Sequence, residues 1–209
     1  MPKGYFITLE GIEGCGKTTQ IARLEHYFLS QGIPTLRTKE PGGTSIGTKI
    51  REILLSTKNK NMEPMTELFL YIADRRQHIH EIILPALQAG KIVLCDRYAD
   101  ATTAYQGAGR RISTEILKKI HKEFLENLTP HLTFLLDLPV KVAIERIKNR
   151  KLDRFETENA EFHSRVRQEY LKIAEAEKNR FTVIHATGTE EDIHEEIKRK
   201  AEQRCGLKS

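Results

Sequence analysis

The stretch that decides the fold is Gly11-Ile12-Glu13-Gly14-Cys15-Gly16-Lys17-Thr18, which is followed by Thr19. Its spacing, G-x-x-x-x-G-K-T, is typical of loops that bind phosphate groups. The glycines let the backbone turn tightly and bring its N–H groups close to an anion. Lys17 adds a positive charge for the phosphates, and the Thr18 hydroxyl can ligate a magnesium ion that accompanies them.

The residues on either side of this loop supply the structural context that the pattern requires. Residues 5–10 (YFITLE) read as a mostly apolar strand, and residues 20–29 (QIARLEHYFL) carry apolar side chains at helical spacing. A strand, a glycine-rich loop and a helix in this order place the positive end of the helix against an anion. We therefore predict that residues 11–19 bind the phosphates of a nucleotide.

Strand and helix patterns alternate along the rest of the chain. Further strands are expected at residues 33–39, 91–95, 131–137 and 181–185, and helices at 46–55, 63–88, 113–127, 139–149, 160–178 and 190–203. Pro85 predicts a kink or a break in the second of these helices. Such alternation favours an α/β fold, a P-loop NTPase-type doubly wound five-stranded parallel sheet flanked by helices, in a single domain over residues 1–209.

Composition limits the class of protein. The formal net charge is +5, but acidic residues are mixed with the basic ones and no aromatic stripe accompanies them. A small polyanionic substrate accounts for this excess as well as nucleic acid does, so we expect no nucleic-acid partner. No apolar run could span a membrane, the first residues do not resemble a signal peptide, and Cys15, Cys95 and Cys205 lack metal-binding spacing. We expect a cytoplasmic protein that does not bind membranes.

The phosphate loop alone is compatible with a kinase, an ATPase motor or a GTPase switch. The switch motifs of GTPases are absent, since no aspartate is followed by glycine three positions later. A motor typically carries Asp-Glu after an apolar strand, whereas here Asp96 is followed by Arg97. The carboxylate can hold magnesium, and the guanidinium can bind a second anionic group. This pair favours a kinase whose acceptor itself carries a phosphate.

Several further motifs are specific enough to indicate a family. They are Leu9-Glu10-Gly11, Glu40-Pro41-Gly42-Gly43-Thr44, Ala73-Asp74-Arg75, Gln77-His78, Asp96-Arg97-Tyr98, Ala104-Tyr105-Gln106-Gly107 and Leu152-Asp153-Arg154-Phe155-Glu156. On these motifs, which extend over nearly the whole chain, the sequence resembles the bacterial thymidylate kinases, a family of P-loop nucleoside monophosphate kinases. The resemblance implies transfer of the γ-phosphate of ATP to dTMP with Mg²⁺ as cofactor, and a homodimer formed through the helices of residues 63–125.

The resemblance also implies roles for individual residues. ATP would be bound by Gly11, Ile12, Glu13, Gly14, Cys15, Gly16, Lys17, Thr18 and Thr19, and the metal by Thr18 and Asp96. dTMP would be bound by Glu13, Glu40, Pro41, Arg51, Tyr71, Arg75, Arg97, Thr102, Tyr105 and Gln106. The catalytic residues would be Lys17, Arg97, Arg150 and Arg154. In this scheme Arg51 and Arg97 hold the acceptor phosphate, Tyr71 stacks on thymine, and residues 186–188 contact adenine.

A basic stretch after the predicted helix of residues 139–149 suggests a lid. Some relatives carry an arginine inside the phosphate loop, but Ile12, Glu13 and Cys15 occupy those variable positions here. We interpret residues from about 146 to 156 as a short mobile lid that closes Arg150 and Arg154 over ATP. Closure would also exclude water from the reacting phosphates.

Lys39, Ala101 and Lys151 depart from the usual family pattern, so the contacts that these three residues would make are in question.

Two alternative functions remain open at this point. One is a kinase of another deoxynucleotide or nucleoside on the same fold, and the other is a non-catalytic nucleotide-binding regulator. A separate hypothesis is that the positive loop activates Cys15 toward oxidation.

Overall fold

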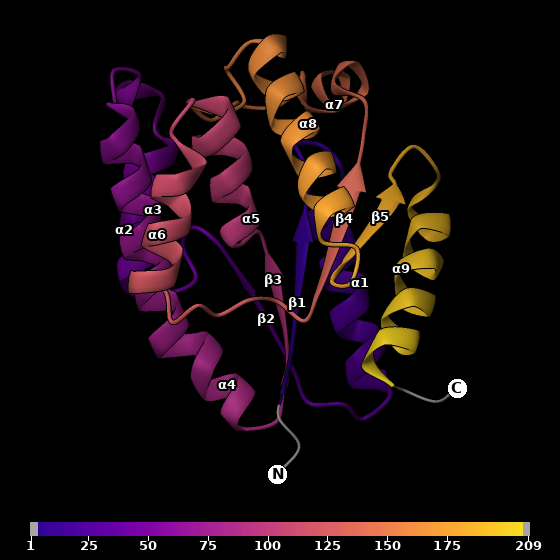
Figure 1. Ribbon diagram of the computed structural model, residues 1–209. Coiled ribbons are helices and arrows are strands. Elements are labelled where there is room, and N and C mark those ends of the chain that lie inside the picture. Colours follow the sequence, from indigo (N-terminus) through magenta and orange to yellow (C-terminus); the bar gives the residue numbers. More distant parts are fainter. Residues whose placement is uncertain (1–3, 207–209) are drawn as a thin grey trace.

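A five-stranded parallel sheet forms the centre of the computed structural model, which describes residues 4–206 (Figure 1). The strand order is β2-β3-β1-β4-β5, and the strands are β1 (Tyr5–Glu10), β2 (Thr35–Lys39), β3 (Ile92–Asp96), β4 (Leu132–Asp137) and β5 (Phe181–His185). All neighbouring strands are parallel. The inner strands β1, β3 and β4 are almost wholly buried, as expected where helices cover both faces of a sheet.

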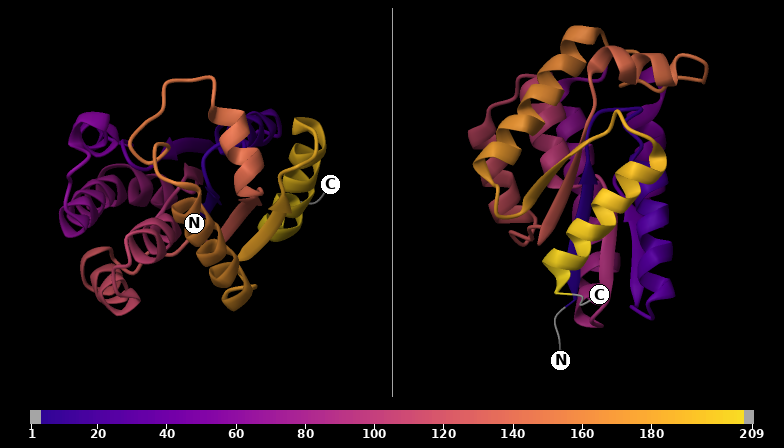
Figure 2. Two further views of the ribbon diagram at one scale, coloured as in Figure 1. Left: turned by 90° about the horizontal axis from the view of Figure 1, so that it is seen from above. Right: turned by 90° about the vertical axis from the view of Figure 1, so that its right-hand side faces the viewer.

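The helices are α1 (Lys17–Ser30), α2 (Ser45–Leu55), α3 (Pro64–His78), α4 (Leu84–Gln88), α5 (Ala99–Thr102), α6 (Thr114–Phe124), α7 (Val140–Ile147), α8 (Ala160–Ala176) and α9 (Glu190–Cys205). A short 3₁₀ turn, Thr57–Asn59, and two π-helical segments, Ile79–Ile83 and Thr103–Gly109, complete the ordered elements. Helices α1 and α9 pack together on one side of the sheet, and α8 lies on the other side against the segment Thr103–Gly109 (Figure 2). The doubly wound α/β prediction is therefore confirmed.

Several expected helices end at other residues than predicted, and one is divided. Helix α8 ends at Ala176 rather than at residue 178, and α9 ends at Cys205 rather than at residue 203. Helix α6 ends at Phe124 rather than near residue 127, because Glu126 and Asn127 adopt left-handed φ values of 54° and 47°. The region expected as one helix over 63–88 forms α3 and α4 with a π-helical segment between them. Pro85 lies in the first turn of α4, and the π-helical segment ends two residues before it, so the irregularity lies beside the proline that predicted it. Helix α7 ends at Ile147, two residues early.

The sheet places the segments that carry the motifs at one edge. Strands β1, β2 and β3 run parallel, and their carboxyl ends meet, with Leu9 and Lys39 both paired with Asp96. The phosphate loop, the turn that begins with the cis peptide Glu40–Pro41, and Arg97 follow directly from these ends. Ligands of open α/β sheets bind at this edge. In the region from residue 4 to residue 206, no helix is long and apolar enough to cross a bilayer.

Candidate active site

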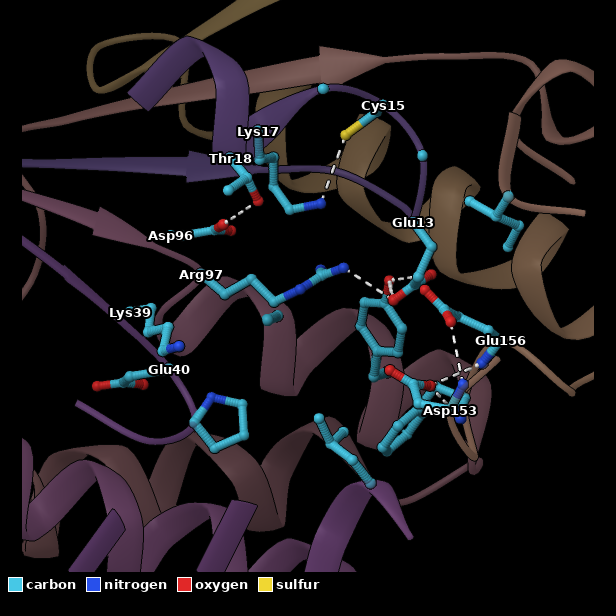
Figure 3. Close-up of a pocket in the computed structure, with 18 of the residues that line it drawn as sticks. Glu13, Cys15, Lys17, Thr18, Lys39, Glu40, Asp96, Arg97, Asp153 and Glu156 are labelled. Atoms are coloured by element: carbon cyan, nitrogen blue, oxygen red, sulfur yellow. Dashed lines mark hydrogen bonds and ion pairs between the residues drawn. The ribbon is translucent and has the colours of Figure 1, made fainter. Parts of the chain in front are cut away.

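A cavity of about 790 Å³ opens at the carboxyl ends of the strands (Figure 3). Its walls come from the phosphate loop, the turn after β2, helices α2 and α3, the residues after β3, and the segment 146–156. Segments that are far apart in the sequence therefore contribute to one site. The volume falls within the range of small-molecule sites in proteins.

The phosphate loop adopts a conformation that requires glycine. Gly11 and Gly14 have φ values of 137° and 74°. A Cβ on either residue would lie 2.6 Å from the Leu136 carbonyl oxygen or 2.8 Å from the Ala143 carbonyl oxygen. The Nζ of Lys17 donates to the carbonyl oxygens of Gly11 and Ile12, at 3.0 Å each. The lysine charge is thus held inside the loop, at the N-terminus of α1.

Thr18 and Asp96 form an oxygen pair that suits a hard cation. The Thr18 hydroxyl donates to Asp96 Oδ2 at 3.2 Å, although the two residues lie on α1 and at the end of β3. Hydroxyl and carboxylate oxygens are the ligands that Mg²⁺ prefers, usually together with water and substrate phosphates. The side chains present therefore fit a magnesium ion.

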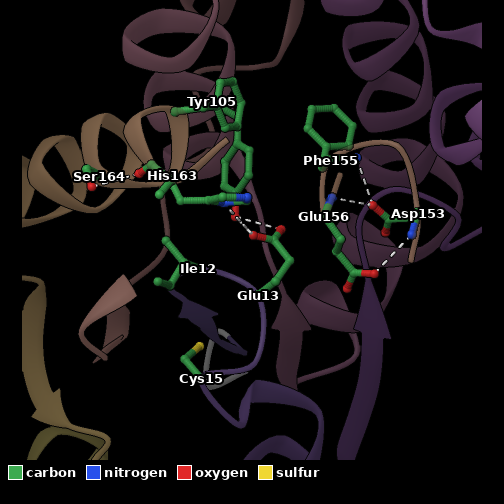
Figure 4. Close-up of polar contacts among 12 residues, drawn as sticks. Ile12, Glu13, Cys15, Tyr105, Asp153, Phe155, Glu156, His163 and Ser164 are labelled. Carbon is green, nitrogen blue, oxygen red and sulfur yellow. Dashed lines mark hydrogen bonds and ion pairs between the residues drawn. The ribbon is translucent and has the colours of Figure 1, made fainter. Parts of the chain in front are cut away.

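Arg97 lines the cavity and points toward Glu13 of the phosphate loop (Figure 3), and Figure 4 shows Glu13 together with Tyr105. Its guanidinium donates to Glu13 Oε1 and to the Gly11 carbonyl oxygen, each at 2.8 Å, and the Tyr105 hydroxyl donates to the same Glu13 carboxylate at 2.7 Å. Burial would raise the pKa of Glu13, but the charges of Arg97 and Lys17 outweigh it and lower the pKa overall. Glu13 is therefore an ionised carboxylate that orients Arg97.

The backbone of Arg97 is itself strained. Its φ of 70° lies in the left-handed region, which non-glycine residues rarely adopt. Such a conformation persists only where the surroundings enforce it, and it is concentrated at functional sites. Here the Arg97 N–H donates to the Leu9 carbonyl oxygen at 3.0 Å, and its guanidinium also reaches the Tyr170 hydroxyl at 3.3 Å.

Arg75 is the centre of a buried polar network on the α3 side of the cavity. It donates to Glu40 Oε2 at 2.6 Å, to Thr102 Oγ1 at 2.8 Å and to the Tyr98 carbonyl oxygen at 2.9 Å. His78 contacts the other Glu40 oxygen at 2.9 Å. Burial opposes ionisation of Glu40, but Arg75 and His78 prevail and lower its pKa. These contacts fix a guanidinium at the cavity wall.

The remaining side chains on this side form an aromatic and cationic lining. Arg51 donates to the Pro41 carbonyl oxygen at 2.8 Å and lines the cavity. The ring of Tyr71 meets Phe155 edge-on, with centroids 6.1 Å apart, and Tyr105 meets the same phenylalanine at 5.8 Å. Phe155 thus forms an aromatic wall between two residues predicted from the sequence to contact the acceptor.

The structure corrects the placement expected of Arg154. Its side chain is buried, donates through Nε to the Leu54 carbonyl oxygen at 2.8 Å, and pairs through Nη1 with Glu67 Oε2 at 2.6 Å. It is not among the residues that line the cavity, so it does not lie over the phosphate loop as a lid residue would. Arg150 does line the cavity, is exposed, and pairs with Glu156.

Most of the other predicted side chains line the cavity together. They are Glu13, Gly14, Cys15, Gly16, Lys17, Thr18, Thr19, Glu40, Pro41, Arg51, Tyr71, Arg75, Asp96, Arg97, Thr102, Tyr105, Gln106 and Arg150. Gly11 and Ile12 do not line the cavity, and their carbonyl oxygens accept hydrogen bonds from Lys17 instead. Of the expected adenine segment, Gly188 lines the cavity.

Several lining residues were not assigned a role from the sequence, and three of them are Arg146, Gln20 and Phe155. Arg146 donates to the Gly14 and Ala186 carbonyl oxygens at 3.3 and 3.1 Å, and so joins the phosphate loop to the segment after β5. Gln20 donates to the Glu190 carbonyl oxygen at 2.8 Å and also lines the cavity. Phe155 is the third. Arg146 and Phe155 belong to stretches that the sequence analysis had marked, whereas the position of Gln20 depends on how α1 packs against α9.

The fold and the site together define a P-loop phosphotransferase. The phosphate loop and the pair Thr18–Asp96 line one half of the cavity, and Arg97, Arg51 and Arg75 line the other half.

Comparisons with known proteins agree with this class. A profile of the family described as thymidylate kinase matches residues 9–197. The chain is 50% identical to a thymidylate kinase of Desulforapulum autotrophicum, with 97% of this chain and 92% of that protein covered. It is 48% identical to a thymidylate kinase of Deinococcus radiodurans, with 94% and 96% covered. The crystal structure of thymidylate kinase from Ehrlichia chaffeensis matches with a TM-score of 0.78 at 34% identity, covering 95% of this chain and 99% of that one. The chain belongs to the thymidylate kinase family.

Asp74 offers a test of the electrostatics around the turn after β2. The Gly42 N–H donates to its Oδ1 at 2.9 Å, while burial and the nearby Glu40 raise the pKa of Asp74 to about 6. The folded state therefore binds this proton more tightly than the unfolded chain does. The free energy of unfolding of the wild type consequently falls as the pH rises from the ordinary aspartate pKa, 3.8, through about 6. The free energy of unfolding of Asp74→Asn, relative to that of the wild type, should therefore increase by up to about 2 kcal/mol as the pH is raised from 4.5 to 7. Urea denaturation at several pH values measures this gain.

The matched control is Glu52→Gln on the exposed face of α2. Its difference from the wild type should stay constant over the same pH range. A pH-independent difference for Asp74→Asn would contradict the assignment of a raised pKa.

Proposed function

We propose that this protein transfers the γ-phosphate of ATP to dTMP, giving dTDP and ADP, with the roles of its residues as follows. The observation that carries the proposal is a single cavity that is lined by the phosphate loop and by a half-buried arginine, Arg97, which donates to the carbonyl oxygen of Gly11 in that loop. Two anionic substrates must meet in such a site. Family membership supports ATP as the donor and dTMP as the acceptor.

The donor half would bind ATP through the phosphate loop. The backbone N–H groups of residues 11–19 and Lys17 would cradle the β- and γ-phosphates at the N-terminus of α1. Thr18 and Asp96 would hold Mg²⁺, which would supply positive charge to the phosphates. Adenine would be contacted by residues 186–188, of which Gly188 lines the cavity, and by Arg146, which lines it too.

The acceptor half would bind dTMP. Arg97 and Arg51 offer planar guanidinium groups to its phosphate, which suits their donor geometry. Tyr71 would stack on thymine, Arg75 would donate to a base carbonyl oxygen, and Tyr105 would lie beside the sugar. The side chains of Glu13, Glu40, Pro41, Thr102 and Gln106 complete this half.

Catalysis in this scheme depends on position and charge. The acceptor phosphate is largely dianionic at neutral pH, since the second pKa of such groups is near 6, so its oxygen needs no general base to attack the γ-phosphorus. The site must hold two anions in line and stabilise the charge on the transferred group. Lys17, Arg97 and Arg150 supply that positive charge. Arg150 would leave Glu156 and move over ATP when the lid closes.

A homodimer is the assembly that we propose. Phe69 on α3 and Ile116 and Phe124 on α6 are 58%, 42% and 55% exposed, which is unusual for large apolar side chains. Arg76 of α3 donates to the Phe124 carbonyl oxygen at 3.0 Å, so these helices lie side by side. These three side chains lie within residues 63–125, and their exposure supports the proposal that this region forms the interface. We also propose that the enzyme works in the cytoplasm and binds neither membranes nor nucleic acid.

The acceptor is tested by measuring ADP release from ATP and Mg²⁺ with dTMP, dUMP, dCMP, dGMP, AMP and thymidine offered separately. Turnover with dTMP should exceed turnover with every other acceptor. Phosphorylation of thymidine but not of dTMP would mean that Arg51 and Arg97 have been misassigned. Binding of ATP without turnover of any acceptor would favour the non-catalytic regulator.

The lid is tested by Arg150→Gln. Because Arg150 is exposed and would reach ATP only in the closed state, its loss should lower kcat by at least ~10-fold and change KM for ATP by less than about 3-fold. The neighbouring Lys151→Gln removes the same charge from an exposed position that does not line the cavity. It should behave as the wild type. A normal kcat for Arg150→Gln would contradict the lid proposal.

A further inference from the structure

Glu67 on α3 is a buried carboxylate that no motif pointed to. It accepts from Gln106 Nε2 at 2.9 Å, from Arg110 Nε at 3.1 and 3.2 Å, and from Arg154 Nη1 at 2.6 Å. Its side chain is 0% exposed. We call Glu67, Gln106, Arg110 and Arg154 the Glu67 cluster. Glu67 of α3 thus contacts Gln106 in the π-helical segment Thr103–Gly109, Arg110 directly after that segment, and Arg154 in the segment after α7.

The buried Glu67 carboxylate is surrounded by positively charged partners. A carboxylate buried without partners would be costly, but two guanidinium groups contact this one. Arg110 is in turn paired with Glu158 at 2.6 Å, so the positive charges are also compensated. An ionised carboxylate offers hydrogen-bond acceptors only. Any amide that contacts it must present its NH₂ group.

This constraint fixes the orientation of the Gln106 side chain. A glutamine amide has a donor end and an acceptor end of nearly the same shape, and its environment selects between them. Because Glu67 takes the Nε2 end, Oε1 is the end that Gln106 can present to the cavity that it lines. The wall of the acceptor half therefore gains a hydrogen-bond acceptor at this point.

We propose that Glu67 is a positioning residue that makes the acceptor pocket select bases with an N3–H group. Thymine and uracil carry a donor at N3, whereas cytosine carries an acceptor there. An acceptor at Gln106 Oε1 would pair with the first two bases and repel the third. Arg75 offers only donors, so at O2 it pairs with all three bases, and only at position 4 would it reject the amino group of cytosine.

This inference rests on the acceptor pocket given under Proposed function, in which Gln106 contacts the base. The measurements are kcat/KM for dTMP, dUMP and dCMP in the wild type, Glu67→Gln and Glu158→Gln. A glutamine at position 67 can donate or accept, so Gln106 becomes free to turn its NH₂ group to the cavity. The dTMP-to-dCMP ratio of kcat/KM should fall by at least ~10-fold in Glu67→Gln. The dTMP-to-dUMP ratio should change by less than about 2-fold, because both bases carry N3–H.

Glu158→Gln is the matched control. It removes a carboxylate that pairs with Arg110 but does not contact Gln106. Its base selectivity should equal that of the wild type. A preserved dTMP-to-dCMP ratio in Glu67→Gln would overturn the proposal. A parallel loss of the dTMP-to-dUMP ratio, or the same change in Glu158→Gln, would also overturn it, because either result indicates general loosening of the pocket.

Two further variants separate this proposal from folding defects and from the pocket assignment. Glu67→Gln combined with Arg154→Met removes one charge of each sign and so avoids an uncompensated buried cation; it should show the same loss of selectivity. Gln106→Leu should lose the dTMP-to-dCMP selectivity as well. Unchanged kinetics in Gln106→Leu would refute the pocket assignment itself. Selectivity lost in Gln106→Leu but kept in both Glu67 variants would overturn only the role of Glu67.

Discussion

The contact between Arg97 and Glu13 joins the two halves of the site. Glu13 belongs to the phosphate loop and Arg97 follows β3, and their side chains meet at 2.8 Å beside the Tyr105 hydroxyl. The arrangement places a positive charge between two sites that must each hold a phosphate. Without such a charge, the repulsion between the two substrates would oppose their approach. The sheet order makes this contact possible, because β1 and β3 are neighbours with their carboxyl ends aligned.

The sequence predicted those features that depend on local pattern. Continuous apolar runs in β3 and β4 and the glycine spacing of the loop each have a direct physical cause in the backbone, and the structure contains them at the expected positions. Pro85 predicted the break between α3 and α4 for the same reason. The cavity also gathers most of the side chains that the motifs indicated, since those motifs follow the ends of parallel strands.

Features that depend on packing across the fold were not predictable in this way. Arg154 and Arg150 look alike in a basic stretch, yet one is buried against Glu67 and the other is exposed. The difference arises because residue 154 packs beside Leu54 at the end of α2, a contact between residues 100 positions apart. Glu67 was missed for a related reason: its importance comes from partners on three other segments. A single sequence does not show such partners unless they share a motif.

The central claim is that Arg97 anchors the phosphate of the acceptor, and calorimetric titration of dTMP and thymidine tests it most directly. These ligands share base and sugar, so the ratio of their dissociation constants measures the contribution of the phosphate. In the wild type, dTMP should bind much more tightly than thymidine. Arg97→Met should reduce this ratio by at least ~10-fold, as expected for charge-assisted hydrogen bonds, and leave thymidine binding within about 2-fold. An unchanged ratio in the variant would contradict the account.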